Sequence, residues 1–287
     1  QRLGCFNPFL LVTLVFKGLG APHTIAYLMY LAVYYFVGCA GFYLLARRLL
    51  RDKTSAFVAF LLLLFSALGT RIFDSYMILM FTPIAWFFYF LVSFSEEPKP
   101  HSFVGVIFTL AIIFTTYLPF YFLIVLVSFF LFYVLFYAKK LPTLALKYIG
   151  FAGRHKILVG VCAVMLVTSL APGYLFFKNA KENADVVLPA RNTNPAAGGL
   201  GVQRQDYANG WAILEEIFFA RHYYTDITQI KFAVLYVPLF AYLVFFLGFF
   251  TRSNKRLWFL FAWSMGLLLL CIPAASPVYT FFYDHII

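Results

Sequence analysis

The chain has 287 residues, of which 63% are hydrophobic and 11% are charged, and its formal net charge is +11. A soluble globular domain has about 25% charged residues, so this composition excludes a soluble fold and predicts that lipid covers much of the apolar surface. The apolar runs are continuous rather than alternating, which favours helices over barrel strands. We therefore expect an all-α, polytopic transmembrane helical bundle.

Apolar segments follow one another along the chain and predict about eight membrane spans. Residues 5–16 form a short run that is interfacial, re-entrant or a truncated span. The spans are expected at residues 22–46, 54–69, 76–94, 102–118, 119–138, 157–177, 232–251 and 257–272. The run from 102 to 138 is too long for one crossing of about 30 Å. Pro119 disfavours helix at Leu118, so we divide the run there; one long, kinked helix is the alternative.

Basic residues are concentrated in four of the expected connections, namely 47–53, 95–101, 139–156 and 252–256. The positive-inside rule places these connections in the cytoplasm, so the net charge is mostly an insertion signal. The long segment 178–231 then faces outward. No aromatic and basic pattern of a nucleic-acid module is present, so we expect no nucleic-acid partner.

The predicted organisation has three regions. Residues 1–177 are the first part of the bundle, 178–231 form an extracytoplasmic loop, and 232–287 form a C-terminal pair of spans. The chain begins with Gln1 and ends just after an apolar stretch, which predicts that it is a piece of a longer protein.

The outer loop contains a predicted amphipathic helix near residues 211–223. Its apolar and acidic positions are Trp211, Leu214, Ile217 and Phe218, with Glu215 and Glu216 beside them. Such a helix lies on the membrane surface, or it packs on the bundle without a ligand. Basic side chains of the same loop are candidate phosphate ligands: Lys178, Arg191, Arg204, Arg221 and His222. Solvated loop charges are the alternative.

Arg71 and Asp74 interrupt two long apolar runs in the sequence TRIFDSYM. Three residues apart, they share one side of a helix. They form either an interfacial ion pair that ends a helix, or an outward-facing site. In a site, Asp74 is a general base or metal ligand and Arg71 holds an anionic group.

His23 lies at the outer mouth of the first clear span, as a helix-terminal residue or as a contact for a phosphate.

Familiar catalytic motifs are absent from the sequence, including a P-loop, GxSxG and HExxH. The four cysteines lie in apolar runs without CxxC spacing: Cys5, Cys39, Cys162 and Cys271. We expect them to be buried and inert.

Several segments resemble bacterial YfhO-type membrane proteins. GFYLLARRLLRDKTSAFVAFLLLLFSALGTR (41–71) resembles a helix, basic loop and helix of that family, and FTPIAWFFYFLVSF (81–94) resembles its next span. The sequence from Val234 to the end resembles a later pair of spans. These are patterns of membrane helices rather than catalytic signatures.

The YfhO-type proteins are similar to the GT-C superfamily of glycosyltransferases. The resemblance implies a donor sugar on a polyprenyl phosphate, an inverting displacement on the outer face of the bacterial cytoplasmic membrane, and an envelope polymer, lipid or protein as acceptor. It implies a phosphate site among Arg71, His23, Arg191, Arg204, Arg221 and His222. The family's main acidic base lies in a first outer loop expected before Gln1, so Asp74 is a secondary acidic residue. A divalent cation is an open option.

Two other functions remain as alternatives. A transporter or flippase of a lipid-linked substrate predicts ionisable residues or broken helices at mid-membrane. The expected spans hold almost no such charge, although Pro83, Pro119 and Pro238 are compatible with broken helices. A non-catalytic membrane scaffold is the remaining alternative.

Overall fold

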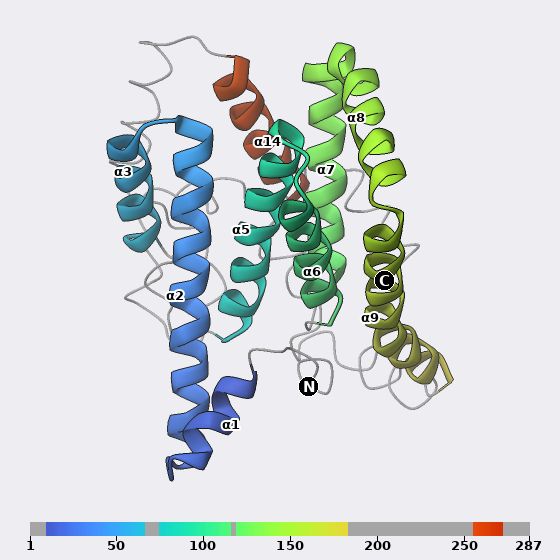
Figure 1. The fold of residues 1–287 in the computed structure, drawn as a ribbon. Coiled ribbons are helices and arrows are strands. Elements are labelled where there is room, and N and C mark those ends of the chain that lie inside the picture. Colours follow the sequence, from blue (N-terminus) through green and yellow to red (C-terminus); the bar gives the residue numbers. More distant parts are fainter. Residues whose placement is uncertain (1–9, 67–74, 116–118, 183–254, 272–287) are drawn as a thin grey trace, which may run out of the picture. The chain divides into compact units, whose positions relative to one another are not determined.

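The computed structural model describes residues 10–66, 75–115, 119–182 and 255–271. Within these ranges every regular element is a helix (Figure 1), as the sequence predicts. The elements are α1 (Leu11–Gly18), α2 (His23–Leu50), α3 (Lys53–Leu64), α5 (Ser75–Glu96), α6 (Pro100–Thr115), α7 (Pro119–Tyr137), the short 3-10 helix η3 (Ala138–Lys140), α8 (Leu141–Arg154), α9 (Lys156–Glu182) and α14 (Lys255–Cys271).

Three stretches of helix are long and apolar enough to cross a membrane. They are His23–Leu50, Ile78–Glu96 and Val125–Arg154. Shorter apolar helices cover Lys53–Leu64, Pro100–Thr115, Lys156–Ala171 and Trp258–Leu267. The chain is therefore a helical protein with three candidate membrane spans in its described part.

The predicted boundaries hold for some elements and shift for others. The division before Pro119 is confirmed, because α6 ends at Thr115 and α7 begins at Pro119. Helix α3 has 12 residues and is about 18 Å long, which is shorter than the span expected at 54–69. The segment 139–156, expected as a connection, is instead mostly helix α8. The span expected at 232–251 lies outside the described residues.

The described helices belong to two compact units. The first unit holds α1 to α6, the start of α7, all of α8, and α9 as far as Phe177. The second unit holds α7 from Val125 onward and α14.

A tight turn joins α1 to α2 in the first unit. Gly20 has a φ of +86°, a conformation that glycine adopts without the penalty other residues meet. The amide of Gly20 donates to the carbonyl of Lys17, and that of Ala21 donates to the carbonyl of Phe16. This is the Schellman arrangement of a helix C-terminus, and it returns the chain toward Pro22 at the start of α2.

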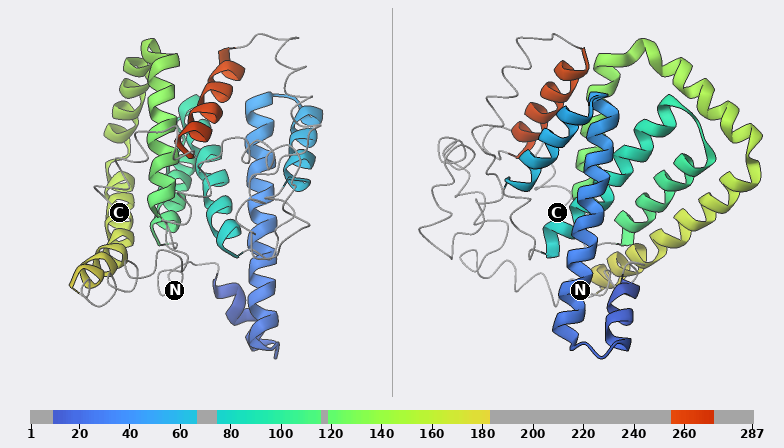
Figure 2. Two further views of the ribbon diagram at one scale, coloured as in Figure 1. Left: turned by 180° about the vertical axis from the view of Figure 1, so that it is seen from behind. Right: turned by 60° about the vertical axis from the view of Figure 1, so that its left-hand side comes forward.

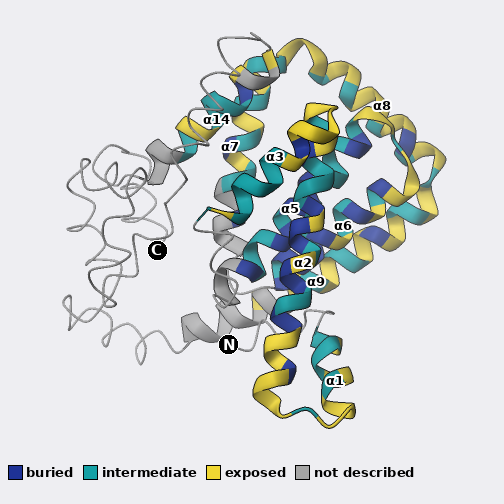
Figure 3. Ribbon diagram, turned by 90° about the vertical axis from the view of Figure 1, so that its left-hand side faces the viewer, coloured by how far each residue is buried: buried dark blue, intermediate teal, exposed yellow. Residues whose placement is uncertain are grey.

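Helices α2 and α5 lie side by side and approach closely (Figures 1 and 3). Their contact depends on glycines of α2. A Cβ atom on Gly41 would lie 2.7 Å from Nε1 of Trp86, and one on Gly38 would overlap Oγ1 of Thr82. Small residues allow helix backbones to approach in membranes, so these positions determine the spacing of α2 and α5.

Two hydrogen bonds cross the same interface. The hydroxyl of Thr82 donates to the carbonyl of Tyr34 at 2.9 Å, and the indole of Trp86 donates to the carbonyl of Val37 at 2.9 Å. The acceptors follow the same order along α2 as the donors along α5, so the two helices run parallel. Each bond satisfies a polar group in an otherwise apolar contact.

An aromatic cluster joins α5, α6 and α8. The ring of Phe94 contacts Phe103 of α6, with centroids 5.6 Å apart, and it also contacts Tyr148 and Phe151 of α8 at 5.0 Å and 4.9 Å. Phe103 contacts Phe151 as well, at 5.3 Å. Tyr148 and Phe151 are three residues apart and share one side of α8. That apolar side explains why a basic segment folds as a helix here. The chain turns from α8 into α9 at His155 (Figure 2).

The second unit is held by rings of α7 against α14. Phe129 packs edge-on to Phe259 and Trp263, with centroids 5.6 Å and 5.2 Å apart. The indole of Trp263 donates to the hydroxyl of Ser128 at 3.0 Å. The two helices are antiparallel, since Tyr137 lies near Lys255 while Ser128 meets Trp263.

Arg51 ends α2 in the left-handed region, with a φ of 59°. This conformation costs a residue with a Cβ atom about 1–2 kcal/mol and costs glycine little. We expect Arg51→Gly to raise the free energy of unfolding by about 1 kcal/mol, measured by thermal unfolding in detergent. Arg51→Ala removes the same charge but keeps the Cβ atom, so it is the matched control. Equal melting temperatures for the two variants would contradict the strain argument.

Candidate functional site

The predicted site residues lie mostly outside the described residues. This holds for Arg71, Asp74, Arg191, Arg204, Arg221 and His222, and also for the amphipathic segment 211–223. Lys178 lies within α9. The roles assigned to these residues therefore stay predictions. His23 is the one predicted site residue with a described side chain.

His23 is the first residue of α2, and Nζ of Lys17 lies 2.7 Å from its Nε2 atom. This distance allows a hydrogen bond in which the ammonium group donates and Nε2 accepts. Pro22 provides no side-chain cap for α2. A lysine thus lies at a helix N-terminus with uncapped amides, where the helix dipole is positive. Both side chains are exposed. This arrangement favours an anionic contact.

The sequence pattern alone does not mark Lys17 as a site residue. The turn that brings it to His23 is nevertheless visible there, as Gly18, Gly20 and Pro22 at alternate positions of one short segment. Glycine and proline so close together between two apolar runs predict a reversal of the chain. Polar residues on its two sides are then neighbours.

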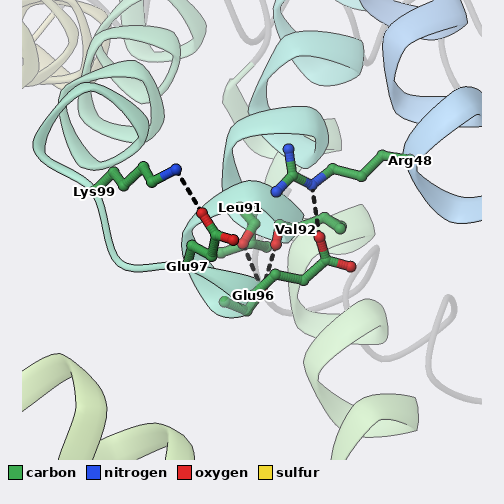
Figure 4. A network of polar contacts seen from close by, with 7 residues as sticks. Arg48, Leu91, Val92, Glu96, Glu97 and Lys99 are labelled. Atoms are coloured by element: carbon green, nitrogen blue, oxygen red, sulfur yellow. Dashed lines mark hydrogen bonds and ion pairs between the residues drawn. The ribbon is translucent and has the colours of Figure 1, made fainter.

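The opposite end of α2 carries a network of ion pairs (Figure 4). Nε of Arg48 lies 2.8 Å from a carboxylate oxygen of Glu96 at the end of α5, and Lys99 pairs with Glu97. Hydrogen bonding to Lys99 lowers the pKa of Glu97 below its usual range. The network confirms that segments 47–53 and 95–101 lie at one end of the bundle. Because Phe94 contacts Phe151, α8 also lies at this end, which we call the basic end.

Asp52 begins α3 at the basic end. Its carboxylate accepts a hydrogen bond of 2.7 Å from the amide of Ser55, as an N-cap residue does. The same bond lowers the pKa of Asp52 below its usual range. Both ion pairs and this cap join or end helices, so the charged groups that form them are structural.

Between its two ends the described bundle is apolar. Helix α2 has no charged residue between His23 and Arg47, and α5 has none before Glu96. Cys39 and Cys162 are free thiols and are buried, as predicted. No group of three or more His, Cys, Asp or Glu that could hold a metal ion occurs in the described part of the chain. The described interior is therefore built for packing rather than for carrying charge.

Comparisons of the chain with protein-family models, with curated proteins and with solved structures give no match. The resemblance to YfhO-type proteins therefore rests on the quoted segments. Two of them fall on described helices, since residues 41–66 cover the end of α2 and all of α3, and residues 81–94 lie within α5. They include Gly41 and Trp86, which meet in the α2–α5 contact.

Proposed function

We propose that the chain belongs to a GT-C-like membrane glycosyltransferase of the YfhO type, with about eight spans. It transfers a sugar from a polyprenyl-phosphate donor to an envelope acceptor on the outer face of the bacterial cytoplasmic membrane. The observation that supports this best is the separation of charge along the first unit. Ionisable groups gather at the two ends of α2, with an apolar stretch between them. Chemistry on a lipid-linked phosphate needs polar groups at a membrane boundary rather than at its centre.

In this proposal the outer end is the end that carries Lys17 and His23. These two residues join Arg71, Arg191, Arg204, Arg221 and His222 as ligands of the lipid phosphate. Cationic groups near the leaving phosphate stabilise the charge that develops in the transition state. Asp74 orients the acceptor or a divalent cation as a secondary acidic residue.

The transporter alternative has less support from the described helices. It requires broken helices or ionisable groups at mid-membrane. Helix α5 continues from Ser75 to Glu96 with Pro83 inside it, and Pro83 is buried. Pro83 therefore does not divide α5, and we favour chemistry at the membrane boundary.

The test is sugar transfer by the full-length protein in proteoliposomes supplied with polyprenyl-phosphate-linked sugars. We expect Arg71→Ala and Asp74→Asn to lower the transfer rate by about 10²-fold, the scale for a group that stabilises transition-state charge. Lys139→Ala removes one exposed charge from the basic end and should leave the rate unchanged. Full transfer by both site variants would reject the site. Movement of the lipid-linked sugar across the membrane without transfer would reject the enzyme and favour the flippase.

A further inference from the structure

Helix α8 has three chemically different sides. Tyr148 and Phe151 contact Phe94 of α5, and Phe151 also contacts Phe103 of α6. Leu146 and Ile149 are 70% and 67% exposed, and at about 100° per residue they lie on the opposite side of the helix. Figure 3 shows exposed residues along much of α8. One side is thus packed on the bundle, while the other presents large apolar side chains outward.

The third side and both ends of α8 are basic. Residues 138–156 contain five lysines and arginines and no aspartate or glutamate. They are Lys139, Lys140, Lys147, Arg154 and Lys156, and all are exposed. The carboxylates at the adjoining end of α5, Glu96 and Glu97, are paired with Arg48 and Lys99. The surface of α8 is therefore complementary to anions.

The position of α8 in the chain indicates a membrane boundary. Helix α7 has 19 residues and is about 28 Å long, nearly the thickness of the hydrocarbon core of a bilayer. Lys139 and Lys140 follow it directly. Lys156 begins α9, whose first part is apolar again. Helix α8 thus has charged residues at both of its ends and lies between two apolar helices in the chain. This arrangement places it at the boundary between the hydrocarbon core and the headgroups.

We propose that α8 binds the headgroups of anionic phospholipids in the membrane that the bundle crosses. Leu146 and Ile149 insert at the boundary of the acyl chains, while Lys147, Arg154 and Lys156 contact headgroup phosphates. Charge complementarity selects anionic lipid as the occupant. Ile157, at the start of α9, is also exposed, at 85%. Exposed apolar side chains on both sides of this joint, next to an apolar helix, suit a bilayer better than a protein partner.

The test places an environment-sensitive fluorophore on α8 of the full chain. Gly150→Cys is suitable, because a Cβ atom there meets nothing within 4 Å. Cys5 and Cys271 are replaced by serine, and the buried Cys39 and Cys162 are left in place. The protein is reconstituted in phosphatidylcholine vesicles with a rising fraction of phosphatidylglycerol. We expect a blue shift that grows with the anionic lipid and falls with added salt.

Neutralisation identifies the residues responsible. Each basic residue near an anionic surface raises the affinity for that surface about fivefold. The combined variant K147Q, R154Q and K156Q should therefore bind anionic lipid about two orders of magnitude more weakly, and the blue shift of the label at position 150 should disappear. The same fluorophore at Gly160→Cys, where a Cβ atom also meets nothing, lies within the apolar first part of α9, away from headgroup charge, and should not respond to anionic lipid. The proposal would be overturned if the label at position 150 gave the same spectrum in neutral and anionic vesicles. It would also be overturned if the blue shift survived replacement of the three basic residues.

Discussion

Gly41→Val is expected to destabilise the contact between α2 and α5 strongly. The new side chain begins at a Cβ atom 2.7 Å from the indole nitrogen of Trp86, so the indole must move. That movement breaks the hydrogen bond from Trp86 to the carbonyl of Val37. Overpacking costs about 1–3 kcal/mol and the lost bond about 1 kcal/mol. Thermal unfolding of the detergent-purified protein should therefore show a free energy of unfolding that is lower by about 2–4 kcal/mol.

Gly160→Val is the matched control for this change. Gly160 lies within α9, and a Cβ atom there meets nothing within 4 Å. The same substitution should be neutral or slightly stabilising, because glycine is a poor helix former. A second variant tests the mechanism: Trp86→Ala should partly offset Gly41→Val, since it makes room for the valine. Additive effects in that double-mutant cycle, or equal melting of the two valine variants, would refute the steric account.

The sequence predicts the lipid environment and the positions of several helices, but it does not predict which residues contact one another. Long apolar runs predict the helices that became α2, α5 and α7, because a continuous run of that length is typical of a helix that crosses a membrane. The importance of Gly41 could not be predicted in the same way. It depends on Trp86, which is far along the chain and is brought close by the parallel packing of α2 and α5. Membrane helices are apolar on all sides, so composition alone does not identify the packed face.

Helix α8 shows a second kind of failure. Its lysines and arginines led to the prediction of a connection at 139–156. The positions of Leu144, Tyr148 and Phe151 already follow helical spacing, but three apolar residues among basic ones predict a helix only if something covers them. The rings of Phe94 and Phe103 provide that cover. Of the candidate site, the sequence identified His23 but not Lys17, since their proximity depends on the geometry of a turn.

Phe151→Ala is expected to release α8 from the bundle while leaving the α2–α5 contact intact. Phe151 is 6% exposed, and its ring lies between those of Phe94 and Phe103. Truncating a buried phenylalanine costs about 3–5 kcal/mol. This cost falls on the docking of one helix, so local opening should increase before global unfolding does. Hydrogen exchange of residues 141–154 should accelerate by roughly 100-fold or more, as about 3 kcal/mol implies, with little change in α2.

Leu146→Ala in the same helix is the control, because Leu146 is on the exposed side and is 70% accessible. In detergent it should leave exchange in α8 close to that of the unchanged protein. Phe94→Ala removes the partner ring from α5 and should reproduce the effect of Phe151→Ala. If Leu146→Ala and Phe151→Ala accelerate exchange equally, the aromatic cluster does not hold α8. If only Phe151→Ala accelerates exchange, as expected, the packed side of α8 holds the helix on the bundle and its exposed side does not contribute.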